Sequence, residues 1–193
     1  PMMLAMLALA ACNKNVGPET PTPVYGNIQV EPVITRATEV NFEDGDKIGL
    51  TVLKGTETYA DNAQMTYAGN VFTGNTLWYT QELDESVFLA YYPYDAAGTP
   101  SVFSPATDQT AGITSSDFMA AKKEGVLPSY NAVSMVFKHM MTKIVVNITN
   151  ESGSPVTAVE IGGLVPSAAI DLVNLQTVPS DVAATAAVKA YES

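Results

Sequence analysis

The sequence contains very few of the residues on which catalysis and metal binding most often depend. Its 193 residues include one cysteine and one histidine. A single cysteine excludes an internal disulfide and the multi-cysteine zinc and iron–sulfur sites, and a single histidine excludes zinc sites that need a histidine pair. The sequence also lacks a Gly-x-Ser-x-Gly elbow and a phosphate-binding loop. We therefore expect a protein that is not an enzyme and that uses no metal or other cofactor.

Positive charge is scarce as well. Nine Lys and Arg residues stand against 20 Asp and Glu residues, and the net charge is −11 at pH 7. This charge repels nucleic acid, so no nucleic-acid partner is expected. Only 15% of the residues are charged and 47% are hydrophobic, which is too apolar for intrinsic disorder. Much of the polarity comes from hydroxyl, amide, Gly and Pro residues, and this mixture predicts an all-β protein.

The chain opens with an uncharged apolar run that is too short to span a bilayer. We interpret residues 1–11 as an incomplete lipoprotein signal peptide. The run ends in Leu-Ala-Ala-Cys12, which resembles a bacterial lipobox, so we predict that the Cys12 thiol is lipidated, with palmitate as one acyl chain. The alternative for Cys12 is a buried or incidental thiol. Residues 12–26 are polar and rich in proline, and they predict an extended tether between the lipid and a folded domain.

From about residue 27 onward, short runs of alternating apolar and polar residues recur between turn signals, which predicts antiparallel sheets. Residues 87–92 are apolar on both faces and predict a central strand that ends before Pro93. Ile144, Val146 and Ile148 alternate with more polar residues and are expected to be buried. Further strands are predicted around residues 48–53, 65–67, 71–73, 77–80, 133–137, 159–161 and 169–175, with turns at Gly69-Asn70 and Gly74-Asn75.

Two stretches carry weaker signals. Residues 94–131 are rich in Asp, Gly, Pro, Ser and Thr, and they predict a long loop with a short helical turn at Ser116–Lys123. The alanine-rich tail over residues 182–193 is compatible with either a helix or a strand.

Four segments carry a resemblance to a known family. Phe42 begins FEDGDKIGL, which is similar to an F-x-x-G-D-x-I-G opening, and Ala90 begins AYYPY, which is similar to an A-Y-Y-P strand end. Ser116 begins SDFMAA, which resembles an S-D-apolar-M-x-A segment, and Phe137 begins FKHMMTKI, which resembles F-x-H-x-M-x-K-I/L. Together, in this order and behind a lipobox, they resemble the fimbrillin-like family of Bacteroidales, the outer-membrane lipoproteins that include type V pilus subunits.

The resemblance implies a fold. Family members are expected to have two domains, each a transthyretin-like Greek-key β-sandwich of about seven strands. For this chain we expect the signal and tether segment to be followed by one such domain over residues 27–193, truncated at its C-terminal end, with the second domain missing.

The resemblance also implies a mode of assembly. An arginine-specific protease would cut after Arg36, displace the strand over residues 25–35 and open a groove that a strand from another subunit fills. Ile28, Val30 and then Val33 or Ile34 supply the alternation that such a strand needs, although Pro32 interrupts it. The alternative for Arg36 is an ordinary exposed or edge-strand arginine.

The function expected from these features is that of a structural or adhesive pilus subunit, lipid-anchored in the outer membrane at the cell surface. The alternative is a surface lipoprotein that does not polymerise and binds a glycan or a host protein. Aromatic rings could stack on a sugar or pack in the core, and these are Trp78, Tyr79, Tyr91, Tyr92 and Tyr94.

The remaining candidates for chemistry have simpler interpretations. We expect His139 to be a hydrogen-bonded structural histidine. Asp44 and Asp46 flank a glycine and are typical of a turn rather than of a calcium loop, and Asp84-Glu85 is typical of a solvated turn.

Overall fold

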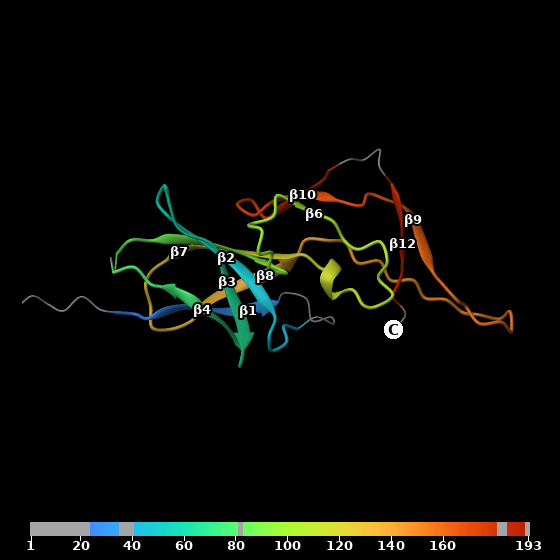
Figure 1. Ribbon diagram of the computed structural model, residues 1–193, viewed down its shortest axis with the longest axis horizontal. Coiled ribbons are helices and arrows are strands. Elements are labelled where there is room, and N and C mark those ends of the chain that lie inside the picture. The colour runs from blue at the N-terminus through green and yellow to red at the C-terminus, as the bar shows by residue number, and fades with distance from the viewer. Residues whose placement is uncertain (1–23, 35–40, 81–82, 181–184, 192–193) are drawn as a thin grey trace, which may run out of the picture.

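A computed structural model of the chain describes residues 24–34, 41–80, 83–180 and 185–191 (Figure 1). In these residues the regular structure is almost entirely β, and the only helical element is a 3-10 turn, η1 (Thr114–Ser116). The prediction of an all-β protein is confirmed. The largest sheet contains β1 (Asn27–Ile34), β2 (Lys47–Lys54), β3 (Glu57–Ala68), β4 (Val71–Leu77), β5 (Ser86–Tyr92), β7 (Met119–Val126) and β8 (Val133–His139).

This large sheet closes on itself as a seven-stranded barrel in the order β1-β4-β3-β2-β5-β7-β8. All neighbouring pairs are antiparallel except β1 and β8, which run parallel and close the ring. This sheet alone has seven strands, whereas about seven were expected for the whole domain and the described residues contain twelve. The Greek-key sandwich stays a prediction.

Two small sheets are built mainly from residues that follow β8, together with β6 from the segment between β5 and β7. One has the order β11-β10-β6 and the other pairs β12 with β9, and Figure 1 places them beside the barrel toward the C-terminal end. Their strands are β6 (Val102–Phe103), β9 (Glu160–Leu164), β10 (Ala168–Asp171), β11 (Gln176–Pro179) and β12 (Ala186–Lys189).

Local sequence explains most of the barrel strands. In β2 the side chains of Ile48, Leu50 and Val52 are fully buried on one face, as the alternation predicts. β5 lies between β2 and β7 and is buried along nearly its whole length, which confirms the predicted central strand. The predicted Gly69-Asn70 turn joins β3 to β4, and both residues have the positive φ angles that a tight hairpin turn of this kind needs.

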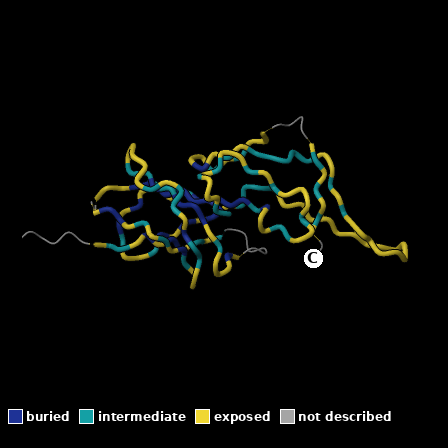
Figure 2. Tube along the Cα trace, viewed as in Figure 1, coloured by how far each residue is buried: buried dark blue, intermediate teal, exposed yellow. Residues whose placement is uncertain are grey.

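The main core fills the barrel, and Figure 2 shows the buried residues gathered there. A second, small cluster of Tyr91, Phe118, Ala120 and Leu172 packs where β5 and β7 meet the segment that follows β10. Nearly all of the apolar burial therefore belongs to the barrel.

Three predictions within the barrel are wrong. Gly74-Asn75 is not a turn, because β4 continues to Leu77, where it ends, and residues 77–80 form no further strand. Gly74 serves close packing instead, since a Cβ there would lie 2.8 Å from the Gln64 carbonyl oxygen. Residues 116–123 do not form a helical turn, because from Met119 onward they are β7, paired with β5. Pairing with a buried central strand outweighs the helical preference of Ala and Lys.

The C-terminal predictions have mixed outcomes. The expected burial of Ile144, Val146 and Ile148 is wrong, because these residues form no strand and are about half exposed, at 49%, 50% and 52%. Their alternation specifies two faces but supplies no partner strand. β9 pairs with β12 rather than with this segment, so the tail is a strand over residues 186–189. The strand predicted over residues 169–175 ends at Asp171, where a turn leads into β11.

Candidate functional site

The four segments that carry the sequence resemblance meet in space at one end of the barrel. Phe42, from the first segment, packs edge-on against Tyr92 of the second and Phe137 of the fourth, with ring centroids 5.4 and 5.3 Å apart. The backbone N–H of Met140 donates to the carbonyl of Phe118, which ties the fourth segment to the third. These motifs therefore act together as packing determinants.

Phe42 is the centre of this arrangement, a packing role that its place at the start of the first motif did not indicate. Its ring also contacts Tyr67 and Phe72, and the residue is 7% exposed. Edge-to-face aromatic pairs each contribute about 0.5–1.5 kcal/mol beyond their buried area. The cluster thus anchors the chain directly after residues 35–40, at the point where it enters β2.

His139 binds the Asp117 carboxylate at the same end of the barrel. Its Nδ1 lies 2.8 Å from each carboxylate oxygen, and both side chains are largely buried. The contact joins the end of β8 to the residue that follows η1, and it confirms the prediction of a hydrogen-bonded histidine.

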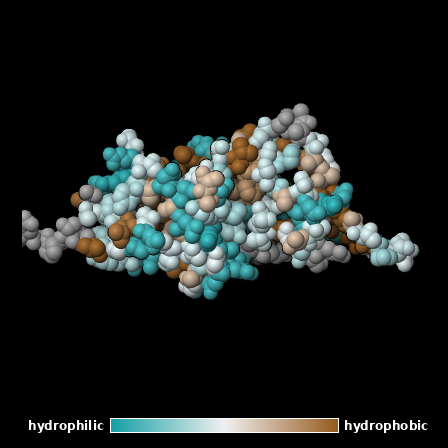
Figure 3. Space-filling model, in the orientation of Figure 1, coloured by the Kyte–Doolittle hydropathy of each residue, from teal (hydrophilic) through white to brown (hydrophobic). Residues whose placement is uncertain are grey.

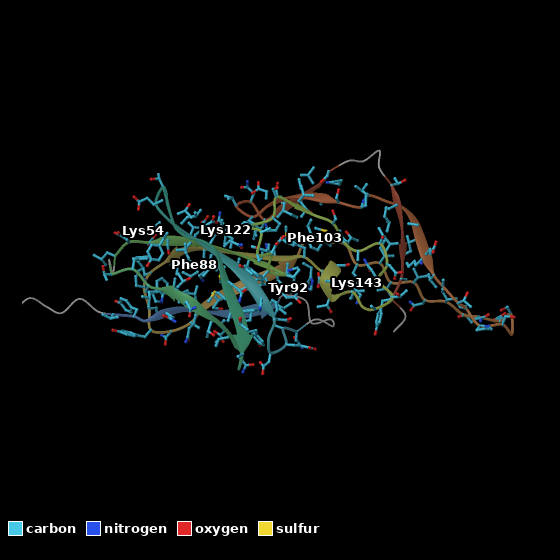
Figure 4. The ribbon with its side chains drawn as sticks, viewed as in Figure 1. Lys54, Phe88, Tyr92, Phe103, Lys122 and Lys143 are labelled. Carbon is cyan, nitrogen blue, oxygen red and sulfur yellow. The ribbon has the colours of Figure 1, made fainter. Side chains whose placement is uncertain are left out.

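Asp46 and Tyr92 form the polar edge of the aromatic cluster. Asp46 lies in the predicted turn, where its carboxylate accepts from the Glu43 N–H. Tyr92, which is labelled in Figure 4, donates to the same carboxylate over 3.3 Å. Burial raises the pKa of Tyr92 to about 12, and the negative charge of Asp46 adds to the increase. The neutral hydroxyl is therefore the form that the folded barrel holds.

We expect alkaline pH to reveal this burial. An unfolded tyrosine ionises near pH 10, whereas folded Tyr92 ionises at about pH 12. Between these values the unfolded state releases a proton that the folded state keeps, so the free energy of unfolding falls as pH rises from about 10 to 12. In urea titrations between pH 8 and 11, the free energy of unfolding of Tyr92→Phe should fall less steeply with pH than that of the wild type.

Two comparisons make this measurement decisive. Tyr92→Phe should keep part of the pH dependence of the free energy of unfolding, because Tyr91 remains and its pKa is also raised, mainly by burial. Tyr130→Phe, at a residue that is 70% exposed, should retain the wild-type slope. Identical slopes in the wild type and Tyr92→Phe would contradict the assignment.

β1 is the strand that closes the barrel, and it has a neighbour on each side. Its first half pairs antiparallel with β4, from Asn27 opposite Leu77 to Val30 opposite Phe72. Its second half pairs parallel with β8, from Val30 opposite Val133 to Ile34 opposite Phe137. The Gly26 carbonyl also accepts from the Trp78 N–H over 2.9 Å. Removing β1 would leave β4 and β8 with open edges.

The side chains of β1 alternate as the sequence predicts. Ile28 and Val30 are fully buried, and Ile34 packs partly buried against the core. Val33 points outward and is 42% exposed. Of the two residues that the sequence left open for the last inward position, Val33 and Ile34, it is therefore Ile34 that faces the core. Pro32 stays in register opposite Met135, so the expected interruption does not occur.

The two site residues predicted from the sequence, Cys12 and Arg36, lie outside the described residues. Arg36 belongs to residues 35–40, which connect β1 to β2, and it is the only arginine in the sequence. The described residues on either side of this connection are held in the barrel, by Ile34 before it and by Phe42 after it. A cut in the connection would therefore leave β1 bound only by non-covalent contacts.

A matched pair of valines tests the orientation of β1. Val30→Ala should lower the free energy of unfolding by about 1–3 kcal/mol, because it leaves a cavity in the core. Val33→Ala should change it by less than about 0.5 kcal/mol, since that side chain is partly exposed. Urea denaturation followed by tryptophan fluorescence measures both, and equal losses would show that the assigned faces are wrong.

The aromatic residues considered for glycan stacking are mostly core residues. Trp78, Tyr79, Tyr91 and Tyr92 are 7% exposed or less, so core packing is the correct interpretation for these four. In the part of the chain that the structure describes, no group of three or more His, Cys, Asp and Glu side chains could hold a metal ion. Asp84 pairs with Lys54 over 3.0 Å at the surface. Among the described residues there is also no helix long and apolar enough to cross a membrane.

The chain is similar to proteins of one family. The family model described as Fimbrillin-like matches residues 35–193. A Bacteroides uniformis protein named "Putative fimbrium subunit Fim1C" is 29% identical over 176 residues, which cover 83% of this chain and 57% of that protein. The chain thus spans a little over half the length of this curated relative.

The chain is also similar to solved structures. The chain resembles a crystal structure named as a "putative cell adhesion protein" from Bacteroides uniformis, with a TM-score of 0.67, 25% identity, and coverage of 89% of this chain and 72% of that one. A second structure with that description, from Bacteroides thetaiotaomicron, has a TM-score of 0.51 and 13% identity, with coverage of 84% and 68%. The second likeness is one of fold alone.

Proposed function

This chain belongs to the fimbrillin-like family, and we propose that it is a structural subunit of a cell-surface fimbrium that assembles by strand exchange at the position of β1. The observation that carries the proposal is the place of β1, between β4 and β8 and joined to β2 through the segment that contains the only arginine. The similarity to a protein named as a fimbrium subunit supports it.

The physical reason for exchange is the cost of an empty β1 position. Loss of β1 exposes the barrel interior around Phe72, Met135 and Phe137 and leaves the backbone groups of two strand edges without partners. Each Val or Ile side chain that a new strand buries contributes about 1.5–3 kcal/mol. A strand from another subunit therefore restores most of what β1 provided.

The geometry sets requirements on the incoming strand. It needs apolar residues at the positions of Ile28, Val30 and Ile34, and the positions of Gln29, Glu31 and Val33 face outward. To pair as β1 does, it runs parallel to β8 and antiparallel to β4. The outward position of Val33 tolerates any side chain.

Attachment to the outer membrane is the second part of the proposal. Residues 1–11 are removed as a signal peptide, Cys12 receives the lipid, and residues 12–26 hold the barrel away from the bilayer. The apolar run that ends in Leu-Ala-Ala-Cys12 supports this assignment.

Replacement of the cysteine tests the anchor. Cys12→Ser removes the thiol that would be acylated, so labelled palmitate should no longer enter the protein, and the protein should leave the membrane fraction of the expressing bacterium. Palmitate incorporation that is unchanged in Cys12→Ser would contradict the assignment.

Proteolysis tests the strand exchange. An arginine-specific protease should cut the wild-type protein once, between Arg36 and Ala37, and the cut protein should bind a labelled peptide of residues 24–36 and form detergent-resistant oligomers. The charge-conserving variant Arg36→Lys should remain uncut and monomeric. A peptide that carries Val30→Asp should bind at least about tenfold more weakly, because it places a charge in the core.

The outcomes separate the two candidate functions. Cleavage followed by peptide exchange and oligomers supports a fimbrial subunit. A protein that is cut but neither exchanges the peptide nor assembles would contradict strand exchange, and it would favour a surface lipoprotein that binds a glycan or a host protein.

A further inference from the structure

Large hydrophobic side chains are exposed together at the end of the barrel where β1 begins. We call them the apolar rim, and each is at least 40% exposed: Val24, Tyr59, Leu77, Leu83, Leu127 and Tyr130. Leu83, Val24 and Tyr130, at 88%, 78% and 70%, are the three most exposed large hydrophobic side chains among the described residues. The strongest apolar exposure in this part of the chain is therefore concentrated on the rim.

Strand pairing brings the rim residues to one end of the barrel. The first residue of β1 lies opposite the last residue of β4, and the first residue of β5 lies opposite the last residues of β2 and β7. The connections that carry Leu83 and Leu127 adjoin these strand ends. Figure 3 shows hydrophobic side chains on the visible face at this end, the left end of the molecule, where β1 begins in Figure 1.

Side chains of the rim are held by contacts between different elements. The Tyr130 ring, in the connection from β7 to β8, packs against Tyr25 just before β1, with ring centroids 4.7 Å apart. The Tyr59 hydroxyl of β3 donates to the carbonyl of Leu77 at the end of β4 over 2.9 Å. These contacts join four connections and strand ends into one surface.

The composition of the rim fits the interface between a lipid bilayer and water. Aliphatic side chains can enter the apolar region, while tyrosine places its ring beside them and keeps its hydroxyl at the polar boundary. Single exposed apolar residues are normal in a folded protein, but a group of them on one surface marks a place where a protein or a membrane binds.

The charges beside the rim favour a lipid without net charge. Lys54 pairs with Asp84 over 3.0 Å, which leaves the exposed carboxylates of Glu57 and Glu85 in excess. The protein as a whole also carries a net charge of −11. Both features oppose binding to anionic lipids, whose surface potential is negative.

The N-terminal part of the chain indicates which surface the rim meets. Eleven residues separate Cys12 from Val24, so they reach at most about 40 Å even when fully extended. A lipid on Cys12 would therefore keep the rim close to the bilayer. A second contact with the membrane strengthens binding beyond what the lipid provides alone.

We propose that the apolar rim docks end-on onto a zwitterionic bilayer and thereby orients the barrel. This inference rests on the proposed attachment through Cys12 and adds a second membrane contact to it. β1 runs from the rim to Ile34 at the opposite end, about 25 Å away. Docking would thus turn the residues on either side of the connection with Arg36, Ile34 and Phe42, away from the membrane, where a protease has access.

The only tryptophan tests this orientation, because Trp78 directly follows Leu77 of the rim. The protein is coupled through its single cysteine, Cys12, to a maleimide lipid in phosphatidylcholine vesicles. A nitroxide on the lipid headgroups should then quench Trp78 fluorescence. The double variant Leu83→Asp and Tyr130→Asp should stay coupled but lose this quenching. Both side chains are at least 70% exposed, so the fold should tolerate the change.

A matched double variant serves as the control. Val102→Asp and Val178→Asp change residues of β6 and β11 that are 50% and 61% exposed and lie outside the rim. This variant should be quenched like the wild type. Chemical coupling does not depend on lipidation in the cell, so a failure of the rim is distinguishable from a failure of the Cys12 anchor.

Vesicle flotation measures the affinity of the rim without any lipid on the protein. In the Cys12→Ser background, the rim variant should bind phosphatidylcholine vesicles at least about tenfold more weakly than its parent, because two charges would enter the interface. The control variant should bind like the parent. All three proteins retain residues 1–11, so any binding by that run is common to them. Phosphatidylglycerol in the vesicles should weaken binding.

Two results would overturn the proposal. One is equal quenching and equal vesicle binding in the wild type, the rim variant and the control variant. The other is a dimer mass in light scattering of the lipid-free protein that disappears only in the rim variant, which would make a second copy of the chain the occupant. Rim-dependent quenching together with palmitate incorporation that persists in Cys12→Ser would support the rim and contradict the anchor.

Discussion

The structure depends on the pairing of β1 with β4 on one side and β8 on the other. A sheet of seven strands has two edges unless one strand joins its ends, and open edges expose backbone donors and acceptors to other chains. β1 removes both edges and also buries Ile28 and Val30 in the core. The same contacts thus close the barrel and define the position at which we propose strand exchange.

The aromatic cluster around Phe42 makes the rest of the barrel less dependent on that strand. Phe42 packs against residues of β3, β4, β5 and β8, so the chain downstream of residues 35–40 is fixed by contacts that do not involve β1. The ring contacts that hold Phe42 are distinct from the strand pairing that holds β1.

The candidate site was predictable to different degrees. The alternation of Ile28 and Val30 indicated a half-buried strand, and the resemblance to the family pointed to Arg36. The sequence did not indicate that β1 runs parallel to β8, because a parallel pair between distant segments leaves no turn between them to recognise. It also did not show that Pro32 would be tolerated, since that depends on which backbone groups the neighbouring strands use.

The sequence by itself determined the β class, the inward faces of β2 and β8, the central position of β5 and the hairpin turn at Gly69-Asn70, because alternation, apolar runs and turn chemistry are local properties. Only the tertiary structure decided that residues 119–126 are a strand, that β4 continues through Gly74, and that Ile144, Val146 and Ile148 are exposed. Each of these depends on whether a partner is present across the sheet. Alternation fixes which side chains share a face, but burial requires a second surface to cover them.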